Sequence, residues 1–242
     1  MSASSPTALL DQKAKVPKEF NKIARRYDMA TGLSQGYQED LDRSAGFLNL
    51  KGDEYVLDLC CGTGKSTQAV LKFISAGHVV GVDNSETMLE VAKEKLQSQI
   101  AQGKLSFSLQ DAMHLSYPEK SFDAIFMAYG LRNMPDYDAC LRQLYTILKP
   151  GGRLVIHDYS LADHWFSKPY WWIMGNLFIV PISYLTTGEA TIFRYLIKSV
   201  QQFLRPKELL ARLEATGFKQ VTSHAQPSWR RPILRTFVGV KP

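Results

Sequence analysis

The sequence predicts an α/β fold built around a doubly wound parallel sheet. From Glu54 onward, short apolar runs alternate with longer amphipathic stretches, and strands that alternate with helices form parallel sheets. The first apolar run ends in the glycine turn Gly62-Thr63-Gly64, and the second ends in an acid, Asp83. A glycine turn and an acid in these two places are typical of a cofactor site in a fold of this class.

The first half of the sheet is predicted from apolar runs and from one well-marked helix. The expected elements are, in order, strand 55–59, helix 66–75, strand 78–82, helix 85–102 and strand 105–109. Ser85 suits the N-cap of the longer helix, because Ser side chains accept hydrogen bonds from the first free backbone N–H groups. The apolar residues Met88, Leu89, Ala92 and Leu96 then fall on one face of that helix.

The second half of the chain continues the alternation after two interruptions. The expected elements are strand 122–128, helix 137–148, strand 154–158, helix 206–216 and a strand pair at 219–224 and 234–240. Pro150-Gly151-Gly152 is expected to stop the helix before it. The interruptions are residues 18–48, whose apolar spacing is helical, and an aromatic-rich insertion at 160–205.

These patterns predict one domain of 242 residues with a short flexible start. A flexible N-terminus (1–17) is predicted to precede a single domain (18–242). The predicted parts of the domain are, in order, N-terminal helices (18–50), a cofactor-binding core (51–159), an insertion that forms a lid over the bound substrate, the acceptor (160–205), and a C-terminal helix and strands (206–242).

Composition narrows the class of protein further. Hydrophobic residues make up 45% and charged residues 21%, as in ordinary globular proteins. The start lacks the basic-then-apolar order of a signal peptide, and three cysteines give no disulfide framework, so a cytoplasmic location is expected. The net charge is +6, but the basic residues are spread out, which makes nucleic acid an unlikely partner. No metal site is predicted.

The stretch Gly64-Lys65-Ser66-Thr67 looks like the end of a phosphate-binding P-loop, but the rest of that motif is missing. Leu59 stands where the first P-loop glycine is required. Asp58 instead lies inside the first strand, where a carboxylate would repel a pyrophosphate and attract the amino group of S-adenosylmethionine (SAM). The alternative is that Asp58 only caps the turn. Asp83 is placed to hold ribose hydroxyls, as in both NAD and SAM enzymes.

Further polar residues follow the third and fourth predicted strands. Asp111-Ala112 come after the third strand, where a carboxylate can accept a hydrogen bond from the adenine amino group. Ala128–Asn133 come after the fourth, at the carboxyl edge where open α/β sheets bind ligands. The sequence therefore predicts a SAM site at this edge of the sheet.

Several stretches resemble the ubiquinone/menaquinone-biosynthesis C-methyltransferases, a family of class I SAM-dependent methyltransferases. They are FNKIARRYD (20–28), VLDLCCGTG (56–64), GVDNSETML (81–89), QDAMHL (110–115), SFDAIFMAYGLRNMPD (121–136), LKPGGRLVI (148–156) and FRYLIKSVQQF (193–203). The resemblance implies a Rossmann-like, seven-stranded sheet whose last strand is antiparallel. It places Arg132 and Asn133 beside the methyl acceptor. The cofactor contacts that it suggests are Tyr27, Asp58, Gly62, Gly64, Asp83, Asn84, Met88, Asp111, Ala112 and Met113.

The chain departs from the family pattern on the acceptor side. The family usually has Asp directly after GTG, where this chain has Lys65, and reads close to VILEFS where this chain has VIHDYS (155–160). The stretch after Tyr27-Asp28 and the C-terminal tail also differ from the family pattern. Lys65 is interpreted either as a surface lysine or as a cation facing the acceptor.

The function implied by the resemblance is ring C-methylation of a prenylated quinol or phenol. Arg132, oriented by Asn133, is expected to lower the pKa of the acceptor hydroxyl, and His157 or Tyr159 to carry the proton. His157 has the alternative of a purely structural role. Two other functions stay open: N- or O-methylation of a lipid headgroup or secondary metabolite, and a non-catalytic SAM-binding protein.

The insertion contains a long uncharged segment. Residues 170–185 include 16 residues without a charge, fewer than the roughly 18–20 that span a bilayer. Contact of segment 164–185 with a hydrophobic acceptor or a membrane surface is favoured by four aromatic residues in this basic protein, Trp165, Tyr170, Trp171 and Trp172. The alternative is an ordinary buried helical pair. The oligomeric state is left open.

Overall fold

The structure is a computed structural model that describes residues 35–187 and 191–242. The predicted flexible start (1–17), the helical spacing before residue 35 and Tyr27 lie outside the described residues. The first half contains α2 (Gln35–Gly46), β1 (Tyr55–Leu59), α3 (Lys65–Leu71), β2 (His78–Asp83), α4 (Glu86–Lys95), α5 (Gln97–Ala101), β3 (Leu105–Leu109), β4 (Phe122–Ala128) and the 3-10 turn η1 (Leu131–Asn133).

The second half completes the sheet after a helical insertion. It contains α6 (Tyr137–Ile147), β5 (Leu148–Tyr159), α7 (Ser167–Ile173), the π-helical turn η2 (Met174–Ile179), α8 (Val180–Thr187), α9 (Thr191–Gln202), α10 (Pro206–Thr216), β6 (Lys219–Ala225), the 3-10 turn η3 (Ser228–Arg230) and β7 (Leu234–Val240). The predicted elements of the sheet are all present.

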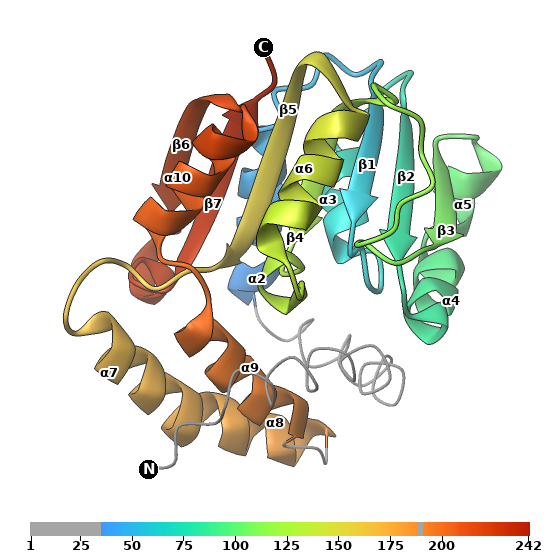
Figure 1. Cartoon of the computed structure of the whole chain (residues 1–242). Coiled ribbons are helices and arrows are strands. Elements are labelled where there is room, and N and C mark those ends of the chain that lie inside the picture. The colour runs from blue at the N-terminus through green and yellow to red at the C-terminus, as the bar shows by residue number, and fades with distance from the viewer. Residues whose placement is uncertain (1–34, 188–190) are drawn as a thin grey trace.

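The seven strands form one sheet in the order β3-β2-β1-β4-β5-β7-β6 (Figure 1). Strands β1 to β5 pair in parallel, whereas β7 pairs antiparallel with both β5 and β6. The predicted Rossmann-like α/β class and the antiparallel last strand are therefore confirmed. The strand order reverses between β1 and β4, and open α/β sheets bind their ligands at the carboxyl ends of strands at such a point.

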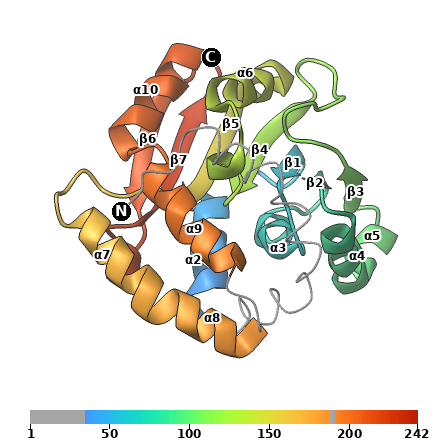
Figure 2. The same cartoon turned by 60° about the horizontal axis from the view of Figure 1, so that its bottom comes forward.

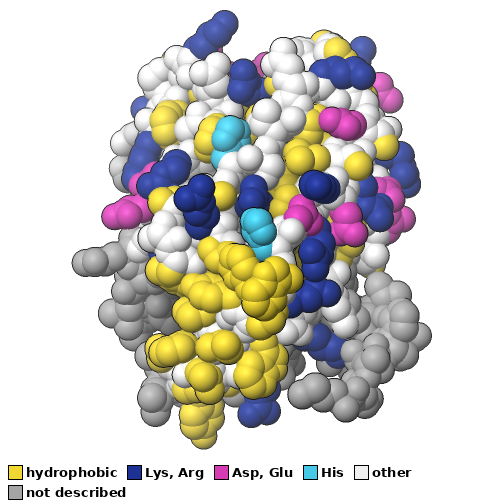
Figure 3. Space-filling view, turned by 90° about the vertical axis from the view of Figure 1, so that its left-hand side faces the viewer, with side chains coloured by type: hydrophobic (Ala, Val, Ile, Leu, Met, Phe, Trp, Pro, Cys, Tyr) yellow, Lys and Arg dark blue, Asp and Glu magenta, His cyan; other side chains and the backbone are white. Residues whose placement is uncertain are grey.

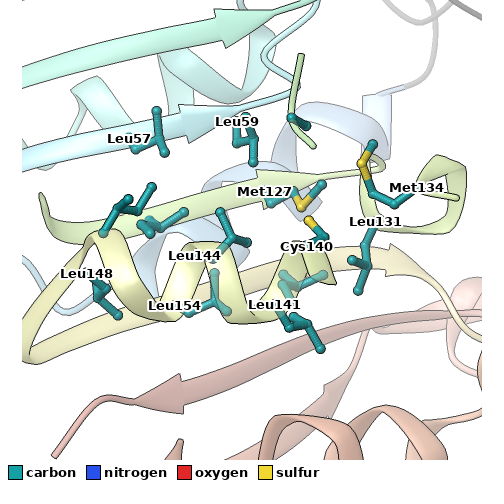
Figure 4. Packing of buried hydrophobic residues seen from close by; sticks show 14 of the residues in the cluster. Leu57, Leu59, Met127, Leu131, Met134, Cys140, Leu141, Leu144, Leu148 and Leu154 are labelled. Carbon is teal, nitrogen blue, oxygen red and sulfur yellow. The ribbon is translucent and has the colours of Figure 1, made fainter. Parts of the chain in front are cut away.

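Helices cover both faces of the sheet. Alternate residues of β1 point to opposite faces, so Leu57 and Leu59 pack with α6 and α10, while Val56 packs with α2 and α3. Figure 4 shows Leu141 and Leu144 of α6 packed against the strands on the first of these faces. The hydrophobic side chains on both faces of the sheet are buried. This packing holds β1 and β4 in place beneath the loops that follow them.

Two helix predictions are wrong in their bounds. The helix expected over 66–75 ends at Leu71, and the helix expected over 85–102 is two helices, α4 and α5. The break falls at Leu96, which leaves helical geometry with φ −112° and ψ 24°. Leu96 is buried, and a Cβ on Gly64 would lie 2.9 Å from its side chain, so the residue at the break packs against the glycine loop.

The fifth strand is longer than predicted, since it begins at Leu148 and not at Leu154. Leu148 pairs with Phe122, and the two glycines of the predicted turn exchange backbone hydrogen bonds with Lys241. The Pro-Gly-Gly stretch therefore does end helix α6, as predicted, but it lies within the sheet because strands distant in sequence supply its partners.

The insertion forms helices beyond the carboxyl ends of the parallel strands (Figure 1). Figure 2 shows α9 between α2 and the outer pair α7–α8. Trp171 is fully buried and its indole N–H donates to the carbonyl of Ile197 in α9 at 3.1 Å. Pro181 cannot donate to the turn before it, and the helix widens into the π turn η2 just ahead of it.

Candidate active site

A cavity opens at the carboxyl ends of β1, β2 and β4, where the topology places a ligand site. The glycine loop after β1, the end of β2 and the turn after β4 form three of its walls, and α2 adds a fourth. The lining residues are Tyr37, Leu41, Leu59, Cys60, Cys61, Gly62, Thr63, Lys65, Ser66, Val82, Asp83, Asn84, Ser85, Met88, Gln110, Ala112, Ala128, Tyr129, Gly130, Arg132, Asn133 and Met134.

The glycine loop is tightly folded. Cys60, Gly62 and Gly64 all have positive φ angles, of 60°, 52° and 84°. A Cβ on Gly64 would lie 2.9 Å from Leu96, so α4 packs directly on the loop, while a Cβ on Gly62 would meet nothing within 4 Å. Gly64 is therefore required for packing, and Gly62 leaves open space in the wall of the cavity.

Asp83 fastens the end of β2 to this loop. Its carboxylate accepts hydrogen bonds from the backbone N–H of Gly62 and of Ser85, both at 2.9 Å. Ser85 in turn caps α4 as predicted, accepting from the N–H of Met88 at 3.2 Å. Burial raises the pKa of Asp83, and the backbone donors oppose the rise. Each carboxylate oxygen has a further lone pair, so Asp83 can still accept bonds from ribose hydroxyls.

Asp58 lies behind the cavity wall and does not line it. One carboxylate oxygen accepts from the hydroxyls of Ser66 and Thr67, at 2.8 and 2.6 Å. These two residues end the stretch that resembles a P-loop, and their hydrogen bonds tie the start of α3 to β1. The other oxygen is buried and has no hydrogen-bond partner among the described residues. A buried carboxylate oxygen is costly without a partner, so this oxygen fits pairing with a cationic group of a ligand.

Asp58 is expected to make SAM binding depend on pH. Burial raises its pKa to about 7. Because the pKa of Asp58 is higher in the folded than in the unfolded protein, the protonated carboxyl stabilises the fold at low pH, and this stabilisation is lost as pH rises through 7. The ionised carboxylate that forms above pH 7 attracts a cation, so a cationic ligand group that pairs with Asp58 should bind better there. SAM affinity should rise about tenfold from pH 6 to pH 8 in isothermal titration calorimetry.

The matched variant is Asp58→Asn, which keeps the shape and removes the titration. Its SAM affinity should be weaker at pH 8 and nearly flat across the same range. A wild-type affinity that does not change between pH 6 and pH 8, or a variant that keeps the wild-type slope, would contradict the role of Asp58.

On the acceptor side, Arg132 forms a buried ion pair. Its guanidinium donates to Asp158 at 2.8 Å and to the carbonyl of Tyr129, and its backbone N–H donates to the second oxygen of Asp158 at 3.1 Å. The side chains are 6% and 0% exposed. Burial raises the pKa of the Asp158 carboxyl, and the charge and hydrogen bonds of Arg132 oppose the rise. The cation is thus fixed at the cavity wall with its charge partly compensated.

Asn133 joins the turn η1 to the insertion. Its amide donates to the carbonyl of Tyr129 at 3.2 Å, and its oxygen accepts from the hydroxyl of Tyr195 in α9 at 3.0 Å. The helical insertion therefore reaches the predicted acceptor residues through a tyrosine that the sequence reasoning missed. Tyr195 lies in the stretch FRYLIKSVQQF, which was matched only as a family segment.

The structure places His157 and Tyr159 outside the lining, which differs from their predicted position beside the acceptor. His157 is fully buried, and burial lowers its pKa to about 3, so it stays neutral and is unsuited to carry a free proton. Tyr159 packs its ring between those of Tyr129 and Trp171. Both side chains are held by long-range contacts that strand periodicity does not reveal.

Asp111 and Met113 also lie off the cavity wall. The Asp111 carboxylate accepts from the backbone N–H of Met113 at 2.9 Å, and its side chain is 55% exposed. Its neighbours Gln110 and Ala112 line the cavity instead. An aspartate two residues before a free N–H readily closes such a local turn, which turns the carboxylate toward solvent.

Lys65 is the first residue of α3 and lines the cavity. Its ammonium lies 5.6 Å from the centre of the Tyr37 ring, and that ring stacks on Tyr129 with centroids 5.3 Å apart. The cavity therefore combines two stacked aromatic rings with the cations of Lys65 and Arg132. Tyr37 in α2 was missed because a single aromatic in a helix gives no signal of its own.

The fold and this site define a class I SAM-dependent methyltransferase, with SAM as its cofactor. The sequence matches the model of the ubiE/COQ5 methyltransferase family over residues 8–229, so the chain belongs to this family. It is 33% identical over 218 residues to a demethylmenaquinone methyltransferase of Lactobacillus johnsonii, covering 86% of this chain and 88% of the relative. It is 31% identical to a ubiquinone/menaquinone biosynthesis C-methyltransferase of Pseudomonas aeruginosa, covering 96% and 91%.

Solved structures with low sequence identity share the fold. Phosphoethanolamine N-methyltransferase 2 of Haemonchus contortus, in complex with SAM, has a TM-score of 0.68 and 17% identity, covering 100% of this chain and 61% of that chain. The [4+2]-cyclase SpnF has a TM-score of 0.69 and 18% identity, covering 94% and 95%. These likenesses support the architecture alone.

Proposed function

We propose that this enzyme transfers the methyl group of SAM to a ring carbon of a prenylated quinol or phenol. The observation that carries the proposal is membership of the ubiE/COQ5 family over nearly the whole chain, together with relatives named for menaquinone and ubiquinone biosynthesis. The cavity supports it, because its acceptor side combines stacked rings (Tyr37, Tyr129) with a buried guanidinium.

The residues divide into two groups. Gly62, Asp83 and Asp58 would hold SAM, which supplies a methyl group activated on a sulfonium. Arg132 and Lys65 would stabilise the phenolate character that the ring carbon needs in order to react. The tyrosine rings would orient the flat acceptor, and such positioning accounts for much of the acceleration of a two-substrate reaction.

Product analysis tests this function. The purified enzyme is incubated anaerobically with SAM and a demethylated prenyl quinol, and the product is examined by mass spectrometry and NMR. We expect one added methyl group on a ring carbon. A methyl group on oxygen or on a headgroup nitrogen would favour the alternative acceptors. Absence of both product and S-adenosylhomocysteine with a full lipid extract would favour a non-catalytic SAM-binding protein.

We also propose a cytoplasmic enzyme that contacts a membrane surface through the outer face of the insertion. In the part of the chain that the structure describes, no helix is long and apolar enough to cross a membrane. Figure 3 shows hydrophobic side chains gathered on one region of the surface, with basic side chains at its border. This apolar patch consists of Trp165, Phe166, Trp172, Ile173, Leu177, Phe178, Ile182 and Tyr184.

The patch predicts binding to anionic vesicles. Trp165, Trp172 and Phe178 are 87%, 49% and 49% exposed, so their triple replacement by serine should weaken co-sedimentation about tenfold without loss of SAM affinity. Trp171 is excluded from this set because it is buried. The matched control is Phe73→Ser, an exposed aromatic just past the far end of α3. Equal vesicle binding by the triple variant would contradict the proposal.

A further inference from the structure

A buried hydrogen-bonded network lies behind Tyr129, on the acceptor side of the cavity. It joins Ser44 of α2, His157 of β5, Thr236 of β7 and Gln226, none of them more than 1% exposed. Nδ1 of His157 lies 2.8 Å from the hydroxyl of Ser44 and 3.1 Å from that of Thr236, and the two hydroxyls are 2.7 Å apart. On the other side of the ring, Nε2 lies 3.1 Å from the hydroxyl of Tyr129.

The outer end of the network fixes the direction of its hydrogen bonds. Arg43 can only donate, and it donates to Oε1 of Gln226 at 3.0 Å. The Gln226 nitrogen must therefore face inward, where its two hydrogens go to Ser44 at 3.1 Å and to Thr236 at 2.9 Å. Neither hydroxyl can then donate back toward Gln226.

Two hydroxyl hydrogens remain, and two acceptors remain for them. One hydrogen lies between Ser44 and Thr236, and the other points at Nδ1 of His157. If Nδ1 carried a hydrogen itself, one buried hydroxyl would lose its acceptor, at a cost of about 1–3 kcal/mol. His157 is therefore the tautomer with its hydrogen on Nε2. A neutral ring agrees with the lowering of its pKa to about 3 by burial.

The Nε2–H group then donates to the oxygen of Tyr129, so the tyrosine hydrogen is directed away from His157. Tyr129 follows β4, has a φ angle of 57° and lines the cavity together with Arg132. A backbone held in this uncommon conformation costs energy, and such positions cluster at functional sites. The network thus fixes the tyrosine oxygen as the acceptor in its bond with His157 and holds the Tyr129 ring beside the guanidinium, which lies 5.7 Å from the ring centre.

We propose that Tyr129 donates a hydrogen bond to an oxygen of the acceptor and that His157 is the residue that positions it. The inference rests on the proposed function in one respect, namely that the acceptor is methylated in this cavity. It assigns the acceptor to molecules that carry a hydroxyl or carbonyl oxygen.

The first test concerns the tautomer and needs no turnover. Nitrogen-15 NMR of the full-length protein should show His157 with a hydrogen on Nε2 and a bare Nδ1, unchanged between pH 6 and pH 8. A hydrogen on Nδ1, or an imidazolium in this range, would overturn the inference.

The second test measures binding and turnover of the acceptor. Tyr129→Phe keeps the ring and should weaken binding of 1,4-naphthoquinol, measured anaerobically with S-adenosylhomocysteine present, by about tenfold. SAM affinity should not change. The matched control is Tyr145→Phe, a half-buried tyrosine packed against Phe218 away from the cavity. Equal quinol affinity for wild type and Tyr129→Phe would overturn the proposal.

His157 is tested through Tyr129. His157→Leu should lower kcat/KM about as much as Tyr129→Phe, and the double variant should be no worse than either single one, because both act on one hydrogen bond. His157→Gln can still donate to the tyrosine and should restore most of the activity. Additive losses would overturn the positioning role. A wild type that methylates no quinol while Tyr129→Phe still weakens quinol binding would count against the proposed function and not against this inference.

Discussion

Arg132→Ala should lower turnover at least about a hundredfold and reduce the free energy of unfolding by about 3–5 kcal/mol. The arginine is 5% exposed and its partner Asp158 is fully buried. Removing the guanidinium leaves a buried carboxylate without its counter-charge, and it also removes the cation nearest the proposed acceptor. Steady-state kinetics and urea denaturation measure the two losses separately.

A paired variant separates structure from chemistry. Arg132→Met combined with Asp158→Asn removes both charges, and replacing a buried ion pair with uncharged residues is often neutral for stability. The double variant should therefore recover most of the unfolding free energy but none of the turnover. If the double variant recovers activity as well, Arg132 is structural and the acceptor must be activated by another group. An Arg132→Ala enzyme of normal activity would contradict the proposed site outright.

Asp83→Ala should weaken SAM binding by about 1–3 kcal/mol, which corresponds to a loss of affinity of roughly 5-fold to 160-fold. The change removes the acceptor for the Gly62 and Ser85 backbone N–H groups, so the glycine loop loses its attachment to β2. It also removes the carboxylate that would hold the ribose. Calorimetry with SAM and S-adenosylhomocysteine gives the loss directly.

Two comparisons make that result specific. Asp83→Asn keeps one carbonyl oxygen and should lose less affinity than Asp83→Ala. Asp53→Ala, an exposed acid before β1, should bind SAM as the wild type does. Unchanged SAM affinity in Asp83→Ala, or tight binding of ATP by the wild type, would contradict a SAM site at the glycine loop.

Local patterns in the sequence determined the fold class, the strands and the cofactor. The glycine turn at 62–64, the acid that ends β2 and the Ser85 cap are each specified by a few neighbouring residues, and the structure has the same turn, strand end and cap. Leu59, which stands where a P-loop requires its first glycine, likewise excluded a nucleotide triphosphate site on local sequence alone. Such features depend on backbone conformation and on hydrophobic period, both of which the local sequence carries.

Tertiary structure alone decided where several side chains point. Asp111 closes a local turn toward solvent, Asp58 is tied to Ser66 and Thr67 behind the wall, and His157 is enclosed in a buried network. The strand β5 extends to Leu148 because Phe122 pairs with it. These outcomes depend on partners distant in the chain. A buried polar group takes whichever partner the packed fold brings within hydrogen-bond distance, and sequence spacing does not encode that choice.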